Sequence, residues 1–389
     1  MQPMFDFQMP TRIVHGCGSV GRVGEIVREH GCARVLLVTD HGLVEAGHVE
    51  RLAAILRAAE LDVTLFSEVH ENPTTADVDA CVVVARAADV DGIVALGGGS
   101  SLDCAKGCNF ILTNGGRMHD YWGVGKAHCD MLPFFAVPTT TGTGSELQSF
   151  ALISDAETHQ KMACGDRRAA ARVAVLDPEL ATSQPRDVIA CTGLDTLSHA
   201  LETAVTLKRS PMSLLFSRES FRRAVRSFER VLVNASDMEA MSDMMLAAAY
   251  GGLAIEHSML GGAHALANPL TANFDLVHGH AVALMLSHVI RYNMHDAGAL
   301  KDYAAHSRIA GMSGTTEREL VHAILGYLAH IMKVAEAPAT LEEANITVSG
   351  AQIDQLAEQA AAQWTAGFNP RPLAADVMAE LYRNVRSSS

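Results

Sequence analysis

Two stretches in the second half of the chain hold side chains that could bind a divalent metal. Asp195 and His199 are four residues apart in a segment rich in leucine and alanine, so on a helix they would lie on one face, about one turn apart. Three imidazoles, His264, His278 and His280, lie in one later segment. One carboxylate and two or three imidazoles are ligands that suit iron or zinc. Alone, an Asp–His pair on one helix face is more commonly a solvated pair or a buried hydrogen bond, so the metal interpretation depends on features elsewhere.

Two glycine runs are candidates for holding a phosphate. The first, 16–21, has the GxGxxG spacing of a dinucleotide-binding turn, with Asp40 about 20 residues further on, but only the short strand 12–14 precedes it. The second, GGGSSLDCAK at 97–106, follows a buried strand and opens a helix. Its glycines let backbone amides approach a pyrophosphate at a helix N-terminus, although a serine there would cap the helix in any case. We expect the second run to be the phosphate site.

A third segment, PTTTGTGSE at 138–146, directly follows an apolar strand. Hydroxyls and glycines at this density suit a site at the carboxyl ends of a parallel sheet, where α/β folds bind ligands. A turn rich in serine and threonine is the structural alternative. Four threonines exceed what a turn requires, so the segment predicts a ligand contact.

The coarse pattern divides the chain into two parts. Short apolar strands are expected at 34–40, 62–66, 91–96 and 134–137, with helices near 43–58, 76–88 and 101–112. Apolar strands that alternate with helices predict a parallel sheet covered on both faces. Beyond 180–186, long amphipathic segments predict helices at 212–232, 238–254 and 317–333. We therefore expect an α/β domain over 1–183 and an all-helical domain over 184–389.

Composition and charge exclude several classes of partner. Of 389 residues, 49% are hydrophobic and 19% charged, which is typical of globular proteins rather than disordered ones. The net charge of -14 would repel phosphate backbones and anionic lipids, so we expect binding to neither nucleic acid nor membranes. No apolar run is long enough to span a bilayer, and the first residues lack the pattern of a secretory signal. The eight cysteines form no CxxC pair, so we expect reduced thiols and a cytoplasmic protein.

Several motifs occur together in one order along the chain. They are GGGSxxDxAK at 97–106, PTTxGTGSE at 138–146, DPEL at 177–180, TGxDxxxHAxE at 192–202, and GxxH plus HG at 261–264 and 278–279. With these motifs the chain resembles the iron-containing (group III) alcohol dehydrogenases, relatives of lactaldehyde reductase and 1,3-propanediol dehydrogenase, over nearly its whole length. The resemblance implies a Rossmann-like α/β dinucleotide-binding domain followed by a helical metal-binding domain, the fold shared with dehydroquinate synthase.

The resemblance also implies cofactors and roles for individual residues. The family's metal positions fall on Asp195, His199, His264 and His278. Its cofactor positions fall on Asp40, Asn72, Gly98, Gly99, Ser100, Asp103, Thr139, Thr140 and Lys161. An acidic residue at position 40 implies NAD(H), because a carboxylate would repel the 2′-phosphate of NADP(H). The implied metal is Fe2+, with Zn2+ as the alternative that the same ligands suit. The implied reaction is hydride transfer between the nicotinamide and a small, in some cases polar, alcohol or aldehyde, and we expect a homodimer or higher homo-oligomer.

The chain departs from the family pattern at several positions. Asn268 stands where the family commonly has a second histidine that is often proposed to help proton movement. Glu256 and His257 place a charge and an imidazole near the expected substrate end, which predicts a pocket unlike that of a simple aliphatic-alcohol enzyme. His280 could compete with His278 as a metal ligand.

Two other functions are compatible with parts of this pattern. A non-redox lyase of the dehydroquinate synthase type also uses a dinucleotide and a metal. It would need several basic residues around a phosphorylated substrate, and the helical half has few near its expected ligands. A non-enzymatic metal- or nucleotide-binding protein is less consistent with four intact ligand positions. Net consumption of NADH separates the dehydrogenase from the lyase, and turnover of any aldehyde excludes the binding protein.

Overall fold

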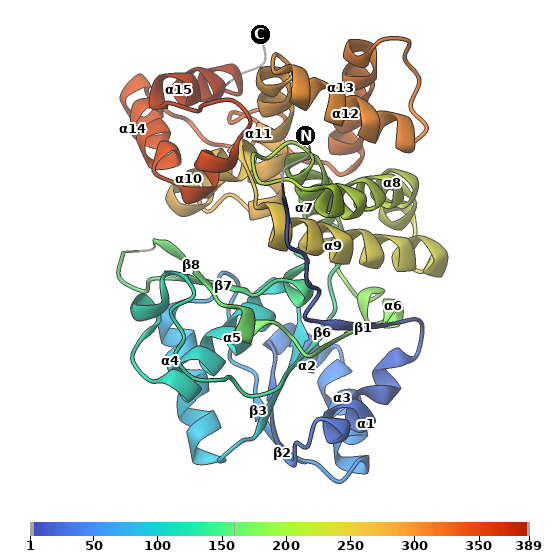
Figure 1. The fold of residues 1–389 in the computed structure, drawn as a ribbon, viewed down its shortest axis with the longest axis vertical. Coiled ribbons are helices and arrows are strands. Elements are labelled where there is room, and N and C mark those ends of the chain that lie inside the picture. Colours follow the sequence, from blue (N-terminus) through green and yellow to red (C-terminus); the bar gives the residue numbers. More distant parts are fainter. Residues whose placement is uncertain (1–3, 159, 387–389) are drawn as a thin grey trace. The chain divides into compact units, whose positions relative to one another are not determined.

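The computed structural model describes residues 4–158 and 160–386, which form two compact units (Figure 1). The sheet unit comprises Gln8–Thr140 and Gly144–Gln184. The helical unit comprises the chain from Pro185 onward, Thr141–Thr143 and the described N-terminal residues up to Phe7.

A six-stranded parallel sheet forms the centre of the sheet unit. Its strands are β1 (Arg12–His15), β2 (Arg34–Val38), β3 (Asp62–Phe66), β4 (Gly92–Gly97), β6 (Phe134–Pro138) and β9 (Val173–Leu176). They lie in the order β1-β9-β6-β4-β2-β3, and every neighbouring pair is parallel. Strands β4, β6 and β9 are buried along their whole length, as continuous apolar strands covered on both faces must be. The predicted α/β architecture is therefore confirmed.

Helices lie between the parallel strands from β1 to β6. They are α1 (Val23–Glu29), α2 (His41–Glu45), α3 (His48–Ala58), α4 (Thr75–Ala87) and α5 (Gly99–Asn114), and a short helix, α6 (Pro178–Ala181), follows β9, the last strand. The prediction of a single helix at 43–58 is wrong, because the helical segment is interrupted at Gly47, between α2 and α3. That glycine has a φ of 78°, a left-handed conformation that ends one helix and begins the next.

A second, smaller sheet in this unit was not predicted. It contains β5 (Gly123–Val124), β8 (Lys161–Gly165) and β7 (Phe150–Ser154), in that order, and β7 and β8 are antiparallel. The register pairs Ser154 with Lys161 at one end and Phe150 with Gly165 at the other. This sheet fixes the backbone of Lys161, one of the predicted cofactor residues.

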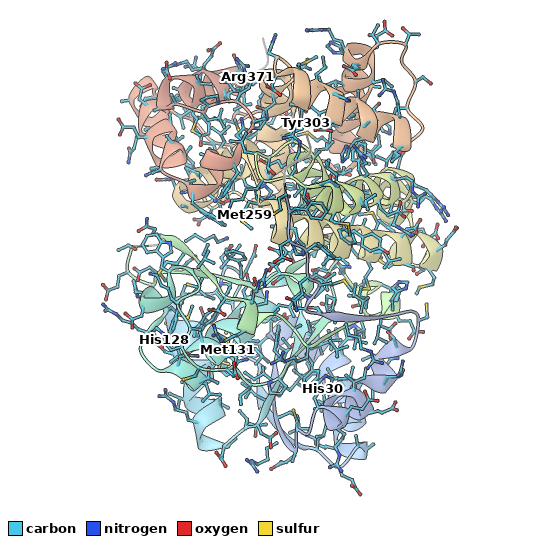
Figure 2. The ribbon with its side chains drawn as sticks, in the orientation of Figure 1. His30, His128, Met131, Met259, Tyr303 and Arg371 are labelled. Atoms are coloured by element: carbon cyan, nitrogen blue, oxygen red, sulfur yellow. The ribbon has the colours of Figure 1, made fainter. Side chains whose placement is uncertain are left out.

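The helical unit contains no strand among its described residues. Its helices are α7 (Arg186–Thr203), α8 (Pro211–Val233), α9 (Met238–Ser258), α10 (Gly262–Phe274), α11 (His278–Asn293), α12 (Ala297–Ile309), α13 (Glu317–Val334), α14 (Gly350–Ala361) and α15 (Ala375–Asn384). Tyr303 on α12 is buried in this unit, and the guanidinium carbon of Arg371 lies 3.8 Å from the centre of the Tyr292 ring (Figure 2). The predicted all-helical second part is confirmed. None of the described helices combines the length and the apolar content that crossing a bilayer requires.

Candidate metal centre and cofactor site

Helix α7 carries the first side chains of the candidate metal centre. Asp195 and His199 are one turn apart on its buried face, at 5% and 4% exposure. The buried hydroxyls of this helix are satisfied by backbone carbonyls one turn back, as Thr192 is by Val188 and Thr203 by His199. The helix can therefore present a carboxylate and an imidazole inside the protein.

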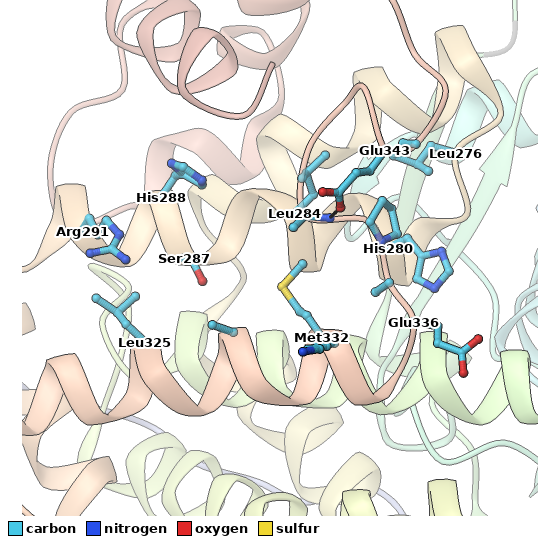
Figure 3. A pocket seen from close by; sticks show the side chains of 16 residues that line it. Leu276, His280, Leu284, Ser287, His288, Arg291, Leu325, Met332, Glu336 and Glu343 are labelled. Carbon is cyan, nitrogen blue, oxygen red and sulfur yellow. Dashed lines mark hydrogen bonds between the residues drawn. The ribbon is translucent and has the colours of Figure 1, made fainter. Parts of the chain in front are cut away.

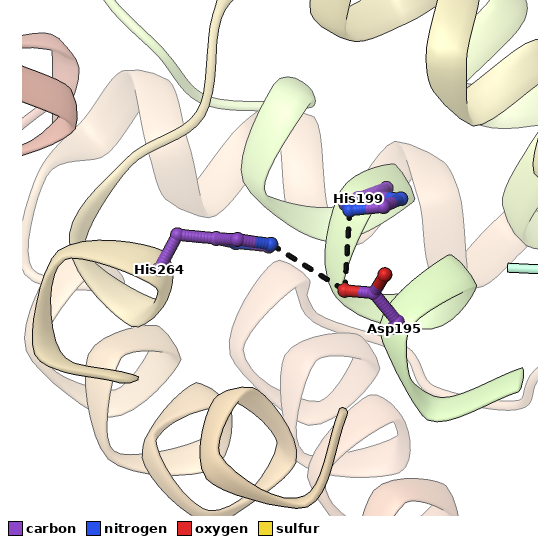
Figure 4. A group of neighbouring side chains, drawn as sticks. All are labelled: Asp195, His199 and His264. Atoms are coloured by element: carbon purple, nitrogen blue, oxygen red, sulfur yellow. Dashed lines mark ion pairs between the residues drawn. The ribbon is translucent and has the colours of Figure 1, made fainter. Parts of the chain in front are cut away.

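Imidazole nitrogens from three helices converge on one carboxylate oxygen of Asp195 (Figure 4 shows two of them). Its Oδ1 lies 3.1 Å from Nε2 of His199, 3.4 Å from Nε2 of His264 on α10 and 4.0 Å from Nε2 of His278 on α11. The ligand atoms of Asp195, His199 and His264 all lie within 4.8 Å of one another. His278 is at the margin of this group and is more exposed.

The atoms at the centre of this group suit a metal ion. Asp195 Oδ1 and His264 Nε2 are buried without a hydrogen-bond partner in the described residues, although they face each other. Four ligand atoms placed tetrahedrally about 2.0–2.1 Å from one ion lie roughly 3.3 Å apart, which is the range of the shorter separations seen here. Unpaired buried polar atoms are costly, and a cation at their centre would satisfy them.

The electrostatics of the group also favour a cation. Burial alone would raise the pKa of Asp195, but the neighbouring His199, His264 and His278 hold that pKa well below its ordinary value. Burial alone would lower the pKa of His264, but Glu202 and Asp195 raise it to about 9. The centre is thus built around retained negative charge.

Glu202 is a residue of this site to which the sequence assigned no role. It lies on α7 at the same face as Asp195 and His199, three residues after His199, and its carboxylate contacts Nδ1 of His264. The only signal in the sequence was its place at the end of the TGxDxxxHAxE motif. Its partner, the first turn of α10, could be identified only in three dimensions.

His280 lies apart from this group. It faces a groove of about 830 Å³ between α11, α13 and residues 336–344, which Leu284, Met332 and Glu343 also line (Figure 3). Burial lowers the pKa of His280. Two residues along a helix turn a side chain to nearly the opposite face, so His280 does not join the ligand atoms around Asp195.

Two of the departures from the family pattern also have clear surroundings. Asn268 donates a hydrogen bond from Nδ2 to Oε1 of Gln363, at 3.0 Å. The ring of His257 packs at a tilt against Phe7, with ring centroids 4.5 Å apart, and Phe7 in turn stacks on Phe216. His257 is therefore part of an aromatic group in the helical unit.

In the sheet unit, the second glycine run and the threonine segment lie side by side. Gly97 pairs with Pro138 where β4 and β6 end, and the amide of Thr139 donates to the carbonyl of Gly97 at 3.0 Å. A Cβ on Gly98 would lie 3.1 Å from Cγ2 of Thr140. Gly99 is the first residue of α5. The predicted residues of the two segments thus share the carboxyl edge of the sheet, beside the N-terminus of α5.

Three more predicted cofactor residues meet at the same helix N-terminus. The amide of Asn72 donates to Oγ of Ser100 at 3.3 Å, and Nζ of Lys161 donates to Oδ1 of Asn72 at 3.2 Å. Asn72 has a φ of 53°, a left-handed conformation that asparagine tolerates better than most residues. The loop that contains Asn72 and the small sheet that contains Lys161 therefore meet at the N-terminus of α5.

The two predicted acidic cofactor residues already make protein contacts. Oδ1 of Asp40 accepts from the amide of Leu43 at 3.1 Å and so caps α2, while its Oδ2 accepts from Oγ of Ser101 at 3.2 Å. Asp103 accepts from Oγ of Ser145 at 2.5 Å and from the amide of Leu152 at 3.1 Å. Carboxylate oxygens have about four acceptor sites in all, so both residues can accept a further hydrogen bond.

The first glycine run holds an anion that the protein itself supplies. The amides of Gly18 and Val20 donate to the two carboxylate oxygens of Asp177, at 3.2 and 3.0 Å, and Asp177 is fully buried. The GxGxxG turn at 16–21 is thus occupied by a carboxylate of the DPEL motif. This contact gives the turn a structural use.

Two family models match the chain. One, described as iron-containing alcohol dehydrogenase, matches residues 10–178. The other, described as the C-terminal part of the Fe-containing alcohol dehydrogenase family, matches residues 189–386. Together the two matches span most of both units.

Individual dehydrogenases are similar over much of their length. The choline dehydrogenase of Bacillus subtilis is 33% identical over 378 residues, which are 96% of this chain and 93% of that protein. The NAD-dependent methanol dehydrogenase of Bacillus methanolicus is 33% identical over 291 residues, 75% and 76% of the two chains. A crystal structure of 1,3-propanediol oxidoreductase has a TM-score of 0.94 at 29% identity and covers 98% of this chain and 100% of its own.

Proposed function

Since this chain belongs to the iron-containing alcohol dehydrogenase family, we propose that it transfers hydride between NAD(H) and a small alcohol or aldehyde at a metal held by the helical unit. The observation that carries this proposal is the convergence of three imidazole Nε2 atoms on Oδ1 of Asp195. The sheet unit, in this proposal, binds the dinucleotide.

The metal ligands are Asp195, His199, His264 and His278. When bound there, Fe2+ or Zn2+ supplies a Lewis acid that lowers the pKa of an alcohol or polarises a carbonyl. The low pKa of Asp195 keeps its carboxylate charged at neutral pH, so it remains available as a ligand. Burial of Asp195, His199 and His264 excludes water from three of the four ligands.

The dinucleotide binds at the carboxyl edge of the parallel sheet. Gly98 and Gly99 let the pyrophosphate approach the N-terminus of α5, and Thr139 and Thr140 border it. Asp40 selects NAD(H), because its carboxylate can accept hydrogen bonds from ribose hydroxyls and would repel a 2′-phosphate. A methanol dehydrogenase described as NAD-dependent is among the relatives, which supports this choice.

The substrate is a small polar alcohol or its aldehyde. Relatives are named for choline, methanol and 1,3-propanediol, which are small, hydrophilic alcohols. Glu256 lies near the end of α9, in the segment where a polar substrate would be recognised, whereas the ring of the neighbouring His257 packs against Phe7. Asn268 cannot accept and release a proton as a histidine does, so the proton of the alcohol leaves by another route.

We further propose a homo-oligomeric enzyme of the cytoplasm. The cysteines of the described structure are all free thiols, which is typical of a reducing compartment. Light scattering of the purified protein measures the number of subunits directly.

A reductase screen tests the proposed function. Metal-free protein is reloaded with Fe2+ or Zn2+ without oxygen and supplied with NADH and a panel of neutral, hydroxylated, anionic and cationic aldehydes. Metal-dependent oxidation of NADH by at least one aldehyde is the expected result. Absence of turnover across the panel with either metal would contradict the proposal.

A further inference from the structure

A buried carboxylate lies directly behind the candidate metal centre. Glu202 is 3% exposed, and its Oε2 contacts Nδ1 of His264. The other nitrogen of the same ring, Nε2, faces Asp195. Because Glu202 and Asp195 both lie on α7, one helix holds the His264 ring from its two nitrogens.

The second oxygen of Glu202 fixes the helix that carries His264. Oε1 accepts hydrogen bonds from the backbone amides of Gly261 at 3.2 Å, Ala263 at 2.7 Å and His264 at 3.4 Å. These amides belong to the N-cap residue and the first turn of α10, which has no side-chain cap of its own. A carboxylate at this position satisfies free N–H groups and interacts favourably with the positive end of the helix dipole.

The fit between Glu202 and α10 also accounts for a glycine of the GxxH motif. A Cβ on Gly261 would lie only 3.2 Å from Oε1 of Glu202 and 3.3 Å from Oδ1 of Asn369. A Cβ at this position would require the carboxylate of Glu202 or the side chain of Asn369 to shift by a few tenths of an ångström. Gly261 and the carboxylate of Glu202 therefore fit together as one structural unit, although they are 59 residues apart in the sequence.

We propose that Glu202 is a positioning residue that sets the metal affinity of the centre through His264. A neutral imidazole carries one N–H, and an acceptor at Nδ1 selects the form in which Nε2 has the free lone pair. Carboxylates behind a metal-binding histidine fix the orientation of the ring and make it a stronger ligand. This inference rests on the proposed metal site and adds a residue outside its ligands.

Glu202→Gln is the direct test, because the amide has the shape of the carboxylate but only one acceptor oxygen. If that oxygen faces the amides of α10, the NH2 group faces Nδ1 of His264 and favours the form that cannot bind metal through Nε2. If the amide turns around, its NH2 group meets three N–H donors. In isothermal titration of the metal-free, full-length protein with Zn2+, we expect affinity to fall by about 10- to 100-fold.

Two further variants separate positioning from stability. Glu202→Asp keeps the charge but shortens the side chain by one methylene, and we expect a Zn2+ affinity between those of wild type and Glu202→Gln. Asn369→Ala removes the 3.3 Å bond from the amide of Gly262, in the same turn of α10, without touching His264. It also removes the bonds of Asn369 to Asn293 and to the carbonyl of Arg371, so it is the more severe test of stability. We expect that control to unfold at a lower temperature while its Zn2+ affinity stays within about threefold of wild type.

These variants remain decisive even if Glu202→Gln does not fold, because Glu202→Asp can then be compared with Asn369→Ala. A Glu202→Gln variant that binds Zn2+ within about threefold of wild type overturns the inference; if that variant does not fold, a Glu202→Asp variant that binds Zn2+ no more weakly than Asn369→Ala overturns it. So does an Asn369→Ala variant that loses as much affinity as the Glu202 variants, because Glu202 would then be only a cap of α10. If wild type binds no Zn2+, the proposed metal site itself is wrong, and this inference is wrong with it.

Discussion

Two helix backbones approach each other closely beside the candidate metal centre. A Cβ at Gly279, the residue after His278 on α11, would lie 2.1 Å from the backbone oxygen of Cys191 on α7 and 2.7 Å from its carbonyl carbon. Non-bonded carbon atoms prefer separations of about 3.5–4.0 Å, so Gly279→Ala requires α11 to move from α7 by roughly 1 Å. Neither atom belongs to a flexible side chain that could move aside.

That displacement should cost both stability and metal affinity. Overpacking of this kind costs about 1–3 kcal/mol, and we expect the upper part of that range because backbone must move. His278 Nε2 is already 4.0 Å from Oδ1 of Asp195. Moving its helix by roughly 1 Å should remove it from the ligand sphere and lower Zn2+ affinity by at least about tenfold.

Thermal unfolding and calorimetric Zn2+ titration measure the two effects separately. Gly326→Ala on α13 is the matched control, since a Cβ there meets no atom within 4 Å. Alanine in a helix interior is favoured over glycine by about 0.5–1 kcal/mol, so the control should be slightly more stable and bind Zn2+ as wild type does. If Gly279→Ala has the melting temperature and the Zn2+ affinity of wild type, the close contact between α7 and α11 is not what positions His278.

Three other predictions concern a buried carboxyl, the two glycine runs and cofactor choice. Burial raises the pKa of Glu146 to about 7 from an ordinary 4.5, so the contribution of this carboxyl to stability is present below pH 4.5 and is lost as the pH rises to 7. Between pH 4.5 and 8, the unfolding free energy of Glu146→Gln should rise by about 3 kcal/mol relative to that of wild type, and a difference that does not change with pH would refute this. Gly99→Val should weaken NADH binding severely in a fluorescence titration, whereas Gly18→Val, at a φ of 75° beside Asp177, should mainly lower the melting temperature. A greater loss of NADH affinity in Gly18→Val than in Gly99→Val would place the pyrophosphate at the first glycine run. Asp40→Gly should lower the unfolding free energy by less than about 1 kcal/mol, because the cap of α2 is lost. It should also narrow the kcat/KM ratio of NADH to NADPH, because the Asp40 carboxylate and the 2′-phosphate of NADPH, as two like charges at ~4 Å, repel each other by about 1–4 kcal/mol. An unchanged ratio would leave Asp40 with its capping role alone.

Local sequence patterns were sufficient to predict most of the helices and strands, because the pattern of apolar residues within each element indicates which of its faces is buried. The predicted strand 62–66 coincides with β3, and the expected helix 212–232 lies within α8. The pair of β7 and β8 was missed because Phe150–Ser154 mixes buried with exposed residues, so it lacks the continuous apolar character of the central strands. The break at Gly47 was missed because one glycine inside a helical pattern is usually tolerated.

The candidate site was partly predictable for a similar reason. Asp195 and His199 are neighbours on one helix face, so their proximity follows from spacing alone. The contact of Glu202 with the first turn of α10 and the contact of Asp177 with Gly18 join residues 62 and 159 positions apart. Such contacts depend on how helices and strands pack, which no local pattern specifies.

Metal stoichiometry tests the central claim most directly. Wild type, Asp195→Ala and His264→Ala are reloaded with Fe2+ under anaerobic conditions, desalted and assayed for bound iron, for circular dichroism and for NADH oxidation with the best aldehyde of the screen. We predict one ion per wild-type chain, activity in proportion to bound iron, and folded variants that retain neither. Undiminished iron in both variants would contradict the assignment of Asp195 and His264 as ligands.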